Sequence, residues 1–286
     1  MTNKENMKRV LPDFLEAGDK IMLATPARFA TQNQIEEAAD RIASAGFTQV
    51  VPVNIDARQN QFGGSDAQRA EILNSAFRDP EIRAVLALRG GYGAGRLLPL
   101  LDTQAYINDP TWIIGFSDIT ALHSWSNNLG IASLHAPVAS TMKMTDEQDV
   151  KWVWDTLKGS PPRAFECTMV GGNLSVLFSL LGTPYFPDCT GCYLFLEDLD
   201  EYLYHIDRMI LAFKLAGVFE RAKGLIVGEF SGLKDNTKAY GQTSDNPFGR
   251  SFKEIIMDHV PKGFHVQFDM PMGHGKRNYP VILSAP

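Results

Sequence analysis

The chain has 286 residues, a mass of 31.7 kDa and an apolar content of 44%. These values suit one large or two smaller packed domains, so they exclude a disulfide-stapled peptide, a fibrous protein and a disordered chain. Lys and Arg number 27 against 33 Asp and Glu, a net charge of −6, which argues against a nucleic-acid partner that would require a broad basic face. The 24 glycines are more informative, because glycines at strand ends bring backbone close to a ligand.

Nothing in the sequence predicts export or membrane insertion. In residues 1–19 charges interrupt every apolar stretch, and no uncharged apolar run approaches the ~20 residues that span a bilayer. We therefore expect a soluble, cytoplasmic protein with no membrane partner. Cys167, Cys189 and Cys192 are an odd number of cysteines and leave no complete disulfide framework. Cys189 and Cys192 have the spacing of redox and zinc motifs, but they lack a second pair, and a turn between two strands is the expected structure.

Apolar segments typical of buried strands alternate with amphipathic segments typical of helices in the first half of the chain. The strands predicted there are residues 20–24, 48–53, 84–88 and 111–116, and the helices are residues 32–45, 66–76, 95–101 and 119–129. This alternation predicts a parallel sheet covered by helices.

The pattern changes after Pro137. Residues 142–159 are polar and predicted to be helical, and the sequence Ser160-Pro161-Pro162 is typical of a linker. We therefore predict a first domain over residues 1–160 and a second over 161–286. In the second, strands at 168–170, 193–196, 224–227 and 266–270 accompany helices at 174–181 and 204–216, which indicates a smaller mixed α/β unit.

Ser117 lies between an apolar strand and a helix start, in the sequence Gly115-Phe116-Ser117-Asp118. A sharp strand-to-helix turn projects a side chain at the carboxyl edge of a sheet and points helix amides at the group it attacks. This is a nucleophile's position, although Ile119 replaces the second glycine of the G-x-S-x-G pattern. A plain helix N-cap is the alternative reading of Ser117.

A glycine cluster, Gly90-Gly91-Tyr92-Gly93, ends the preceding predicted strand and should lie at the same edge of the sheet. Glycines there can bring backbone amides close to a developing oxyanion. Phosphate binding is the competing use, but the cluster lacks the Lys-Ser/Thr pair of a P-loop and matches the dinucleotide fingerprint poorly. A purely structural turn is the third reading.

A serine nucleophile needs a base and a carboxylate that orients the base. His274 is the best candidate of the six histidines because glycines flank it after an apolar strand, with a solvated loop histidine as the alternative. Glu197, Asp198, Asp200 and Glu201 all follow another apolar strand, and spacing does not choose among them. These acids do not have the convergent spacing of a hard-cation site, so no metal is expected.

Eight ordered motifs resemble the serine-type LD-carboxypeptidases, a family that includes the microcin C immunity peptidases. The resemblance extends nearly end to end. The motifs are Gly18-Asp19-Lys20, Gly63-Gly64-Ser65-Asp66, Arg89-Gly90-Gly91-Tyr92-Gly93, Gly115-Phe116-Ser117-Asp118, Gly171-Gly172-Asn173-Leu174, Leu196-Glu197-Asp198, Ile206-Asp207-Arg208 and Gly273-His274.

The family pattern implies roles for single residues. Ser117 would be the nucleophile, Glu197 the orienting acid and His274 the general base, with the backbone amides of Gly91 and Asp118 as the oxyanion hole. The resemblance also implies an N-terminal flavodoxin-like domain, a C-terminal swivelling β/α domain, a site between them and a homodimer. No metal or organic cofactor is implied.

The reaction implied by the resemblance is hydrolysis of the L,D-peptide bond to terminal D-alanine in murein tetrapeptides, a step of peptidoglycan recycling. Further substrate contacts are expected from Arg89, Tyr92 and Asn173, and Arg89 suits the free carboxylate. Residues 201–205 depart from the Glu-Pro-Pro-Tyr-Arg of many members, so the substrate stays open. One alternative is an immunity-type peptidase that cleaves an amide in peptidyl or aminoacyl nucleotides; another is a non-catalytic small-ligand binding protein.

Overall fold

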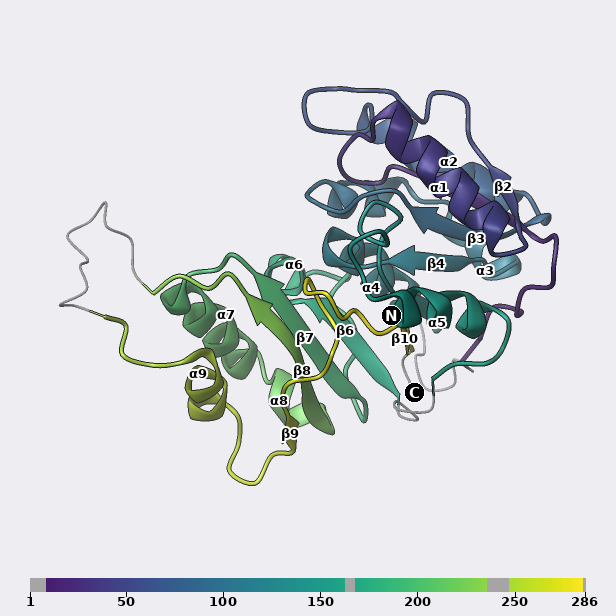
Figure 1. Ribbon diagram of the computed structural model, residues 1–286. Helices are drawn as coiled ribbons and strands as arrows, with labels where there is room; N and C mark the ends of the chain where they lie inside the picture. The colour runs from purple at the N-terminus through teal and green to yellow at the C-terminus, as the bar shows by residue number, and fades with distance from the viewer. Residues whose placement is uncertain (1–8, 163–167, 236–246, 285–286) are drawn as a thin grey trace.

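A computed structural model describes residues 9–162, 168–235 and 247–284. Figure 1 shows two lobes, each built around its own sheet. Residues 163–167, which include Cys167 and follow the predicted domain boundary, lie outside the described residues. The division at residue 160 therefore stays a prediction.

The first sheet has six strands in the order β10-β5-β4-β3-β1-β2. Neighbours among β1 to β5 pair in parallel, and the order 2-1-3-4-5 is that of flavodoxin-like folds, which confirms the predicted class. The strands are β1 (Lys20–Ala24), β2 (Thr48–Val50), β3 (Ile82–Ala87), β4 (Trp112–Gly115), β5 (Ser133–His135) and β10 (Val281–Leu283).

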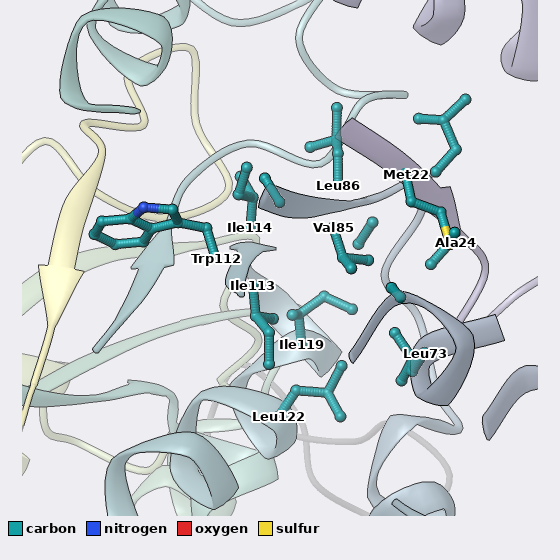
Figure 2. Close-up of a cluster of buried hydrophobic side chains, with 14 of the residues drawn as sticks. Met22, Ala24, Leu73, Val85, Leu86, Trp112, Ile113, Ile114, Ile119 and Leu122 are labelled. Atoms are coloured by element: carbon teal, nitrogen blue, oxygen red, sulfur yellow. The ribbon is translucent and has the colours of Figure 1, made fainter. Parts of the chain in front are cut away.

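Helices cover this sheet and close its core. They are α1 (Gln32–Ser44), α2 (Asp66–Arg78), α3 (Thr103–Asn108), α4 (Thr120–Asn128) and α5 (Glu147–Leu157), with 3-10 turns η1 (Ala94–Leu100) and η2 (Ser117–Ile119). Figure 2 shows Val85 and Ile113 of the sheet facing Leu73 of α2 and Leu122 of α4, all buried. Apolar burial of this kind is the main force that holds the strand ends in place.

The second sheet has four parallel strands in the order β6-β7-β8-β9, which confirms a smaller α/β unit. Ile206, Met209 and Phe213 of α7 repeat at helical spacing and are fully buried in its core. The elements are β6 (Met169–Asn173), α6 (Leu174–Leu180), β7 (Tyr193–Leu199), α7 (Leu203–Leu215), α8 (Val218–Arg221), β8 (Gly224–Ser231), α9 (Phe252–His259) and β9 (Val266–Gln267).

The end of the chain returns to the first sheet. Strand β10 pairs antiparallel with β5, with Val281 opposite His135, and Asn127 of α4 donates a hydrogen bond to the carbonyl of Leu283 at 3.1 Å. Apolar patterning did not predict either short strand. Because β10 follows the strands of the second sheet in the sequence, the chain crosses between the two lobes twice.

Several predicted boundaries were wrong for local reasons. The strand predicted at 48–53 ends at Val50, before Pro52, whose ring cannot donate to a ladder. The helix predicted at 142–159 begins at Glu147, because Asp146 caps it through the amide of Gln148. The helix predicted at 95–101 is a 3-10 turn that contains Pro99.

Cys189 and Cys192 are buried, free thiols in a turn that precedes β7 and follows α6, rather than joining two strands. Burial raises the pKa of the Cys192 thiol to about 12, which disfavours the reactive thiolate. No helix within the described ranges has both the length and the apolar character that a membrane span requires.

Candidate active site

Ser117 occupies a strained turn directly after β4. Its φ is +62°, a left-handed conformation that an L-residue adopts only at a cost of about 1–3 kcal/mol. Gly115 makes the turn possible, because a Cβ there would lie 2.8 Å from Cγ1 of Ile119. Phe116 and Ile119 hold the cap positions of η2 and α4, so the N-cap reading of Ser117 does not apply.

His274 and Glu197 form a hydrogen-bonded pair. Glu197 is in β7 and fully buried, and its Oε2 lies 2.6 Å from Nδ1 of His274, in the loop after β9. Donation by Nδ1 to the carboxylate leaves Nε2 as an acceptor, the tautomer that a general base requires. Gly273 permits this approach with a φ of +136°, since a Cβ there would lie 3.2 Å from the same carboxylate oxygen.

The other three acids, at the end of β7 or directly after it, point elsewhere. Asp198 accepts hydrogen bonds from the side chain of Asn173 and from the amide of Ser175. Glu201 pairs with His205 at 2.6 Å, and Asp200 lies 3.8 Å from the ammonium of Lys234. Glu197 alone among the four contacts His274 in the part of the chain that the structure describes.

Opposing influences act on the pKa of His274. Burial is the largest and lowers it, but the charge and hydrogen bond of Glu197, with the charges of Asp198 and Glu229, raise the pKa above 6.5. His123 and His135 are fully buried and have no carboxylate partner among the described residues. Burial lowers the pKa of His123 to about 4 and that of His135 well below 6.5. The carboxylate therefore distinguishes His274 from its buried neighbours.

The glycine turn after β3 is tied to the serine turn. Oδ2 of Asp118 accepts a hydrogen bond from the amide of Ala94 at 2.7 Å. Asp118 is buried, and burial raises the pKa of its carboxyl although the Ala94 amide and Arg69 oppose the rise. Position 90 lies so close to Ser117 that a Cβ there would be 3.1 Å from the serine Cβ. Both turns thus meet at the carboxyl edge of the sheet, as predicted.

Ser117 and His274 line one cavity of about 380 Å³. The His274 ring packs on the ring of Phe116, the residue before the serine, with centroids 4.6 Å apart. A second cavity of about 440 Å³ shares Phe116, Thr141 and His274 with the first. The remaining residues of the first cavity include Arg28, Arg89, Gly90, Gly91, Ser140 and Leu199.

The predicted substrate residues fall in three different environments. Arg89 lines the cavity and donates to the carbonyl of Phe29 at 3.2 Å. Tyr92 is 55% exposed and packs against Phe62 instead. Asn173 is buried, caps α6 and is absent from the residues that line either cavity.

Arg28 is a cavity residue that the motifs did not identify. It follows β1, on the same carboxyl edge as Arg89, and its charge lowers the pKa of Arg89 in addition to the larger effect of burial. The sequence signal that could have identified Arg28 is its position shortly after the first predicted strand, residues 20–24. Two guanidinium groups at one cavity favour an anionic ligand.

No group of three or more His, Cys, Asp or Glu within the described ranges is arranged to hold a metal ion. What converges at the cavity is a serine hydroxyl, a carboxylate-bound imidazole, glycine amides and two arginines. A hydroxyl, an imidazole and a carboxylate can together perform nucleophilic acyl transfer.

Comparison with known proteins gives the class of the protein: a serine-type hydrolase with two α/β lobes. Residues 21–136 match the family model of the LD-carboxypeptidase N-terminal domain, and residues 166–286 match that of the C-terminal domain. The chain belongs to the LD-carboxypeptidase family, peptidase family S66.

Similarity to known proteins covers nearly the whole chain. The murein tetrapeptide carboxypeptidase of Pseudomonas aeruginosa is 28% identical over 91% of this chain and 89% of its own. The crystal structure of muramoyltetrapeptide carboxypeptidase from Oxalobacter formigenes superposes with a TM-score of 0.79 at 25% identity, covering 93% of this chain and 92% of that one. The two-lobed architecture predicted from the motifs is therefore confirmed.

A self-immunity protein shares the fold. The wild-type apo structure of the microcin C7 self-immunity protein MccF has a TM-score of 0.80 at 20% identity and covers 96% of this chain and 94% of that one. This likeness extends to architecture only.

Proposed function

We propose that this protein is a serine-type LD-carboxypeptidase that releases terminal D-alanine from murein tetrapeptides. One observation carries the chemistry: a serine in a left-handed turn and a histidine bonded to a buried carboxylate line the same cavity. The similarity to a murein tetrapeptide carboxypeptidase over most of both chains supports the substrate class.

In the acylation step, Nε2 of His274 removes the proton from Oγ of Ser117 as that oxygen attacks the carbonyl carbon before D-alanine. Glu197 stabilises the resulting imidazolium through Nδ1, 2.6 Å away. His274 then passes the proton to the leaving amine, the C–N bond breaks, and an ester to Ser117 remains. Water attacks that ester by the same route and regenerates the serine.

The oxyanion of each tetrahedral intermediate would accept hydrogen bonds from the amides of Gly91 and Asp118. Gly91 has a φ of +115°, and a Cβ there would lie 2.5 Å from Cδ of Arg28, so the turn requires glycine. The bond from the Ala94 amide to the Asp118 carboxylate fixes this turn relative to the serine. Donors held in place before the reaction need no reorganisation as charge develops.

A carboxypeptidase must also bind the free carboxylate of its substrate. Arg89 and Arg28 line the cavity beside Gly90 and Gly91, so both are suited to the carboxylate of the departing D-alanine. Tyr92 and Asn173 remain predicted substrate contacts, but the packing of Tyr92 on Phe62 and the capping bonds of Asn173 favour Arg89 as the first to test.

We further propose a cytoplasmic homodimer with a role in peptidoglycan recycling, as the family resemblance implies. Sedimentation equilibrium tests the dimer directly: a mass near twice 31.7 kDa is expected, and a monomer at all concentrations would contradict it.

The decisive experiment measures D-alanine released from murein tetrapeptide by the wild-type protein and by Ser117→Ala. The substitution should reduce the rate by about 10⁴-fold or more, because it removes the nucleophile. Ser140→Ala is the matched control, since Ser140 lines the same cavity without a proposed role in the chemistry. Undiminished release by Ser117→Ala would overturn the assignment.

The immunity-type alternative uses the same residues on a different substrate, and the fold similarity to MccF is the observation that keeps it. A panel should therefore pair murein tetrapeptide with aminoacyl sulfamoyl adenosines. Hydrolysis of the nucleotide compounds without release of D-alanine would favour this alternative. If neither substrate turns over and a serine-directed fluorophosphonate fails to label Ser117, a non-catalytic binding protein is the better description.

A further inference from the structure

The proposed catalytic groups come from two different sheets. Ser117 follows β4 in the six-stranded sheet, whereas Glu197 lies in β7 of the four-stranded sheet. Proton transfer from serine to histidine depends on their separation, so a contact that fixes one sheet against the other near the site would affect the reaction itself. A misplacement of about 1 Å at a reacting centre can cost on the order of 100-fold in rate.

One buried hydrogen bond makes such a contact. Oγ1 of Thr120, the first residue of α4 and three residues after Ser117, accepts a hydrogen bond from the backbone amide of Asn173 at 2.9 Å. Thr120 is fully buried and Asn173 is 3% exposed, so water does not replace either partner. Gly172 allows this approach, because a Cβ there would lie 2.4 Å from the threonine oxygen.

Asn173 is placed directly beside the acid. In the parallel ladder between β6 and β7, Asn173 is the register partner of Glu197. Its side chain donates to Oδ1 of Asp198 at 2.9 Å and accepts from the amide of Val176 at 3.1 Å. The end of β6 is thus held to β7 and to α6 at once, and Thr120 attaches this rigid assembly to the serine turn.

We propose that Thr120 is a positioning residue for catalysis: its hydroxyl oxygen sets the spacing between the Ser117 turn and the Glu197–His274 pair across the two sheets. This inference rests on the proposed function. It assigns no chemical step to Thr120, which acts only through the backbone of Asn173.

The test compares Thr120→Val, which removes the acceptor at nearly constant volume, with Thr120→Ser, which keeps it. For D-alanine release we expect kcat of Thr120→Val to fall about 10- to 100-fold with KM within about twofold, and Thr120→Ser to stay within about threefold of wild type. The acid limb of the pH profile should not move, because the Glu197–His274 bond is left intact. Thr156→Val on α5 is the control, since Thr156 is also fully buried but its Oγ1 has no partner among the described residues.

Equal losses in Thr120→Ser and Thr120→Val, or a loss confined to KM, would overturn the proposal. If Thr120→Val does not fold, Thr120→Ala replaces it in the same comparison. The rate at which a fluorophosphonate labels Ser117 gives a second readout that needs no natural substrate, and it should fall in parallel with kcat. If wild type labels rapidly yet releases no D-alanine, the proposed substrate is wrong and the labelling rates still decide the role of Thr120.

Discussion

The two sheets contribute to the site by different physical means. The six-stranded sheet presents Ser117 and Gly91 through backbone conformation, with φ values of +62° and +115° at turns that follow parallel strands. The four-stranded sheet presents Glu197 and the His274 loop through charge and burial, with a fully buried carboxylate bonded to an imidazole. The contribution of the six-stranded sheet therefore depends on backbone geometry, and that of the four-stranded sheet depends on electrostatics.

Substitutions in the two sheets should therefore have different effects on the reaction. A change in the first sheet should alter kcat without moving the pH dependence, because the carboxylates that act on the pKa of His274 keep their surroundings. A change at Glu197 should alter both, because its charge and hydrogen bond hold the pKa of His274 above 6.5 against the effect of burial.

Glu197→Gln should have the largest effect of the variants that test this division. An amide cannot stabilise the imidazolium and can select the wrong tautomer, so kcat/KM should fall by on the order of 10³- to 10⁴-fold. The wild-type acid limb should have its midpoint above pH 6.5, because His274 must be neutral to act as a base. Without the glutamate charge, burial dominates and the residual activity should show a midpoint at lower pH.

The control for the shift in pH midpoint is a second histidine–glutamate pair. His205 lies 2.6 Å from Glu201, and His205 is outside both cavities. Glu201→Gln should leave the rate and the profile of D-alanine release unchanged. An acid limb that stays at the wild-type pH in Glu197→Gln would show that a group other than His274 controls it.

Gly91→Ala should have the next largest effect, and only on rate. The added Cβ would lie 2.5 Å from Cδ of Arg28, and an alanine at a backbone φ of +115° is strained even if the Arg28 side chain moves aside. The turn should therefore shift, and its amide with it. Loss of an oxyanion donor costs about 10²- to 10³-fold in kcat. The pH midpoint measured in the same assay should match wild type.

Gly18→Ala separates backbone strain from the clash. Gly18 also has a positive φ, +92°, but a Cβ there meets nothing within 4 Å. It should cost some stability and leave kcat unchanged. Equal losses of kcat in both glycine variants would mean that general destabilisation, rather than the oxyanion turn, explains the result.

The sequence predicted the six-stranded sheet and the position of Ser117 well, because the signals for both are local. Parallel strands followed by glycines, and a serine before a helix, report the carboxyl edge of a sheet without knowledge of the rest of the chain. The acid could not be chosen locally. Glu197, Asp198, Asp200 and Glu201 all follow the apolar run at residues 193–196, and only tertiary packing directs Glu197 toward His274. The family resemblance supplied that choice.

Contacts between segments that are far apart in the sequence could not be predicted from local sequence patterns. Strand β10 has three residues and is defined by its pairing with β5, about half the chain earlier. Arg28 belongs to no glycine or catalytic motif, and it reaches the cavity because β1 and β3 are neighbours in the sheet. Such features depend on topology, which periodicity alone does not specify.

The smallest expected effect concerns the loop that carries His274, which is anchored from the opposite lobe. Asp149 of α5 is fully buried and accepts hydrogen bonds from Nε and Nη2 of Arg277, at 2.9 and 2.8 Å, and from the amide of Asn278. Asn278 in turn accepts from the amide of Gly273 at 3.2 Å. Asp149→Asn weakens these charge-assisted bonds and should lower the free energy of unfolding by about 1–3 kcal/mol.

The rate of D-alanine release by the folded Asp149→Asn protein should change little, because the Glu197–His274 bond holds the imidazole independently of Asn278. Asp155→Asn on the same helix is the control: its pair with Lys151 is exposed, and such pairs contribute about 0–1 kcal/mol. Urea unfolding measures both variants. If Asp149→Asn is no less stable than Asp155→Asn but releases D-alanine much more slowly, the anchor serves catalysis rather than folding, and the electrostatic side of the site extends into the first lobe.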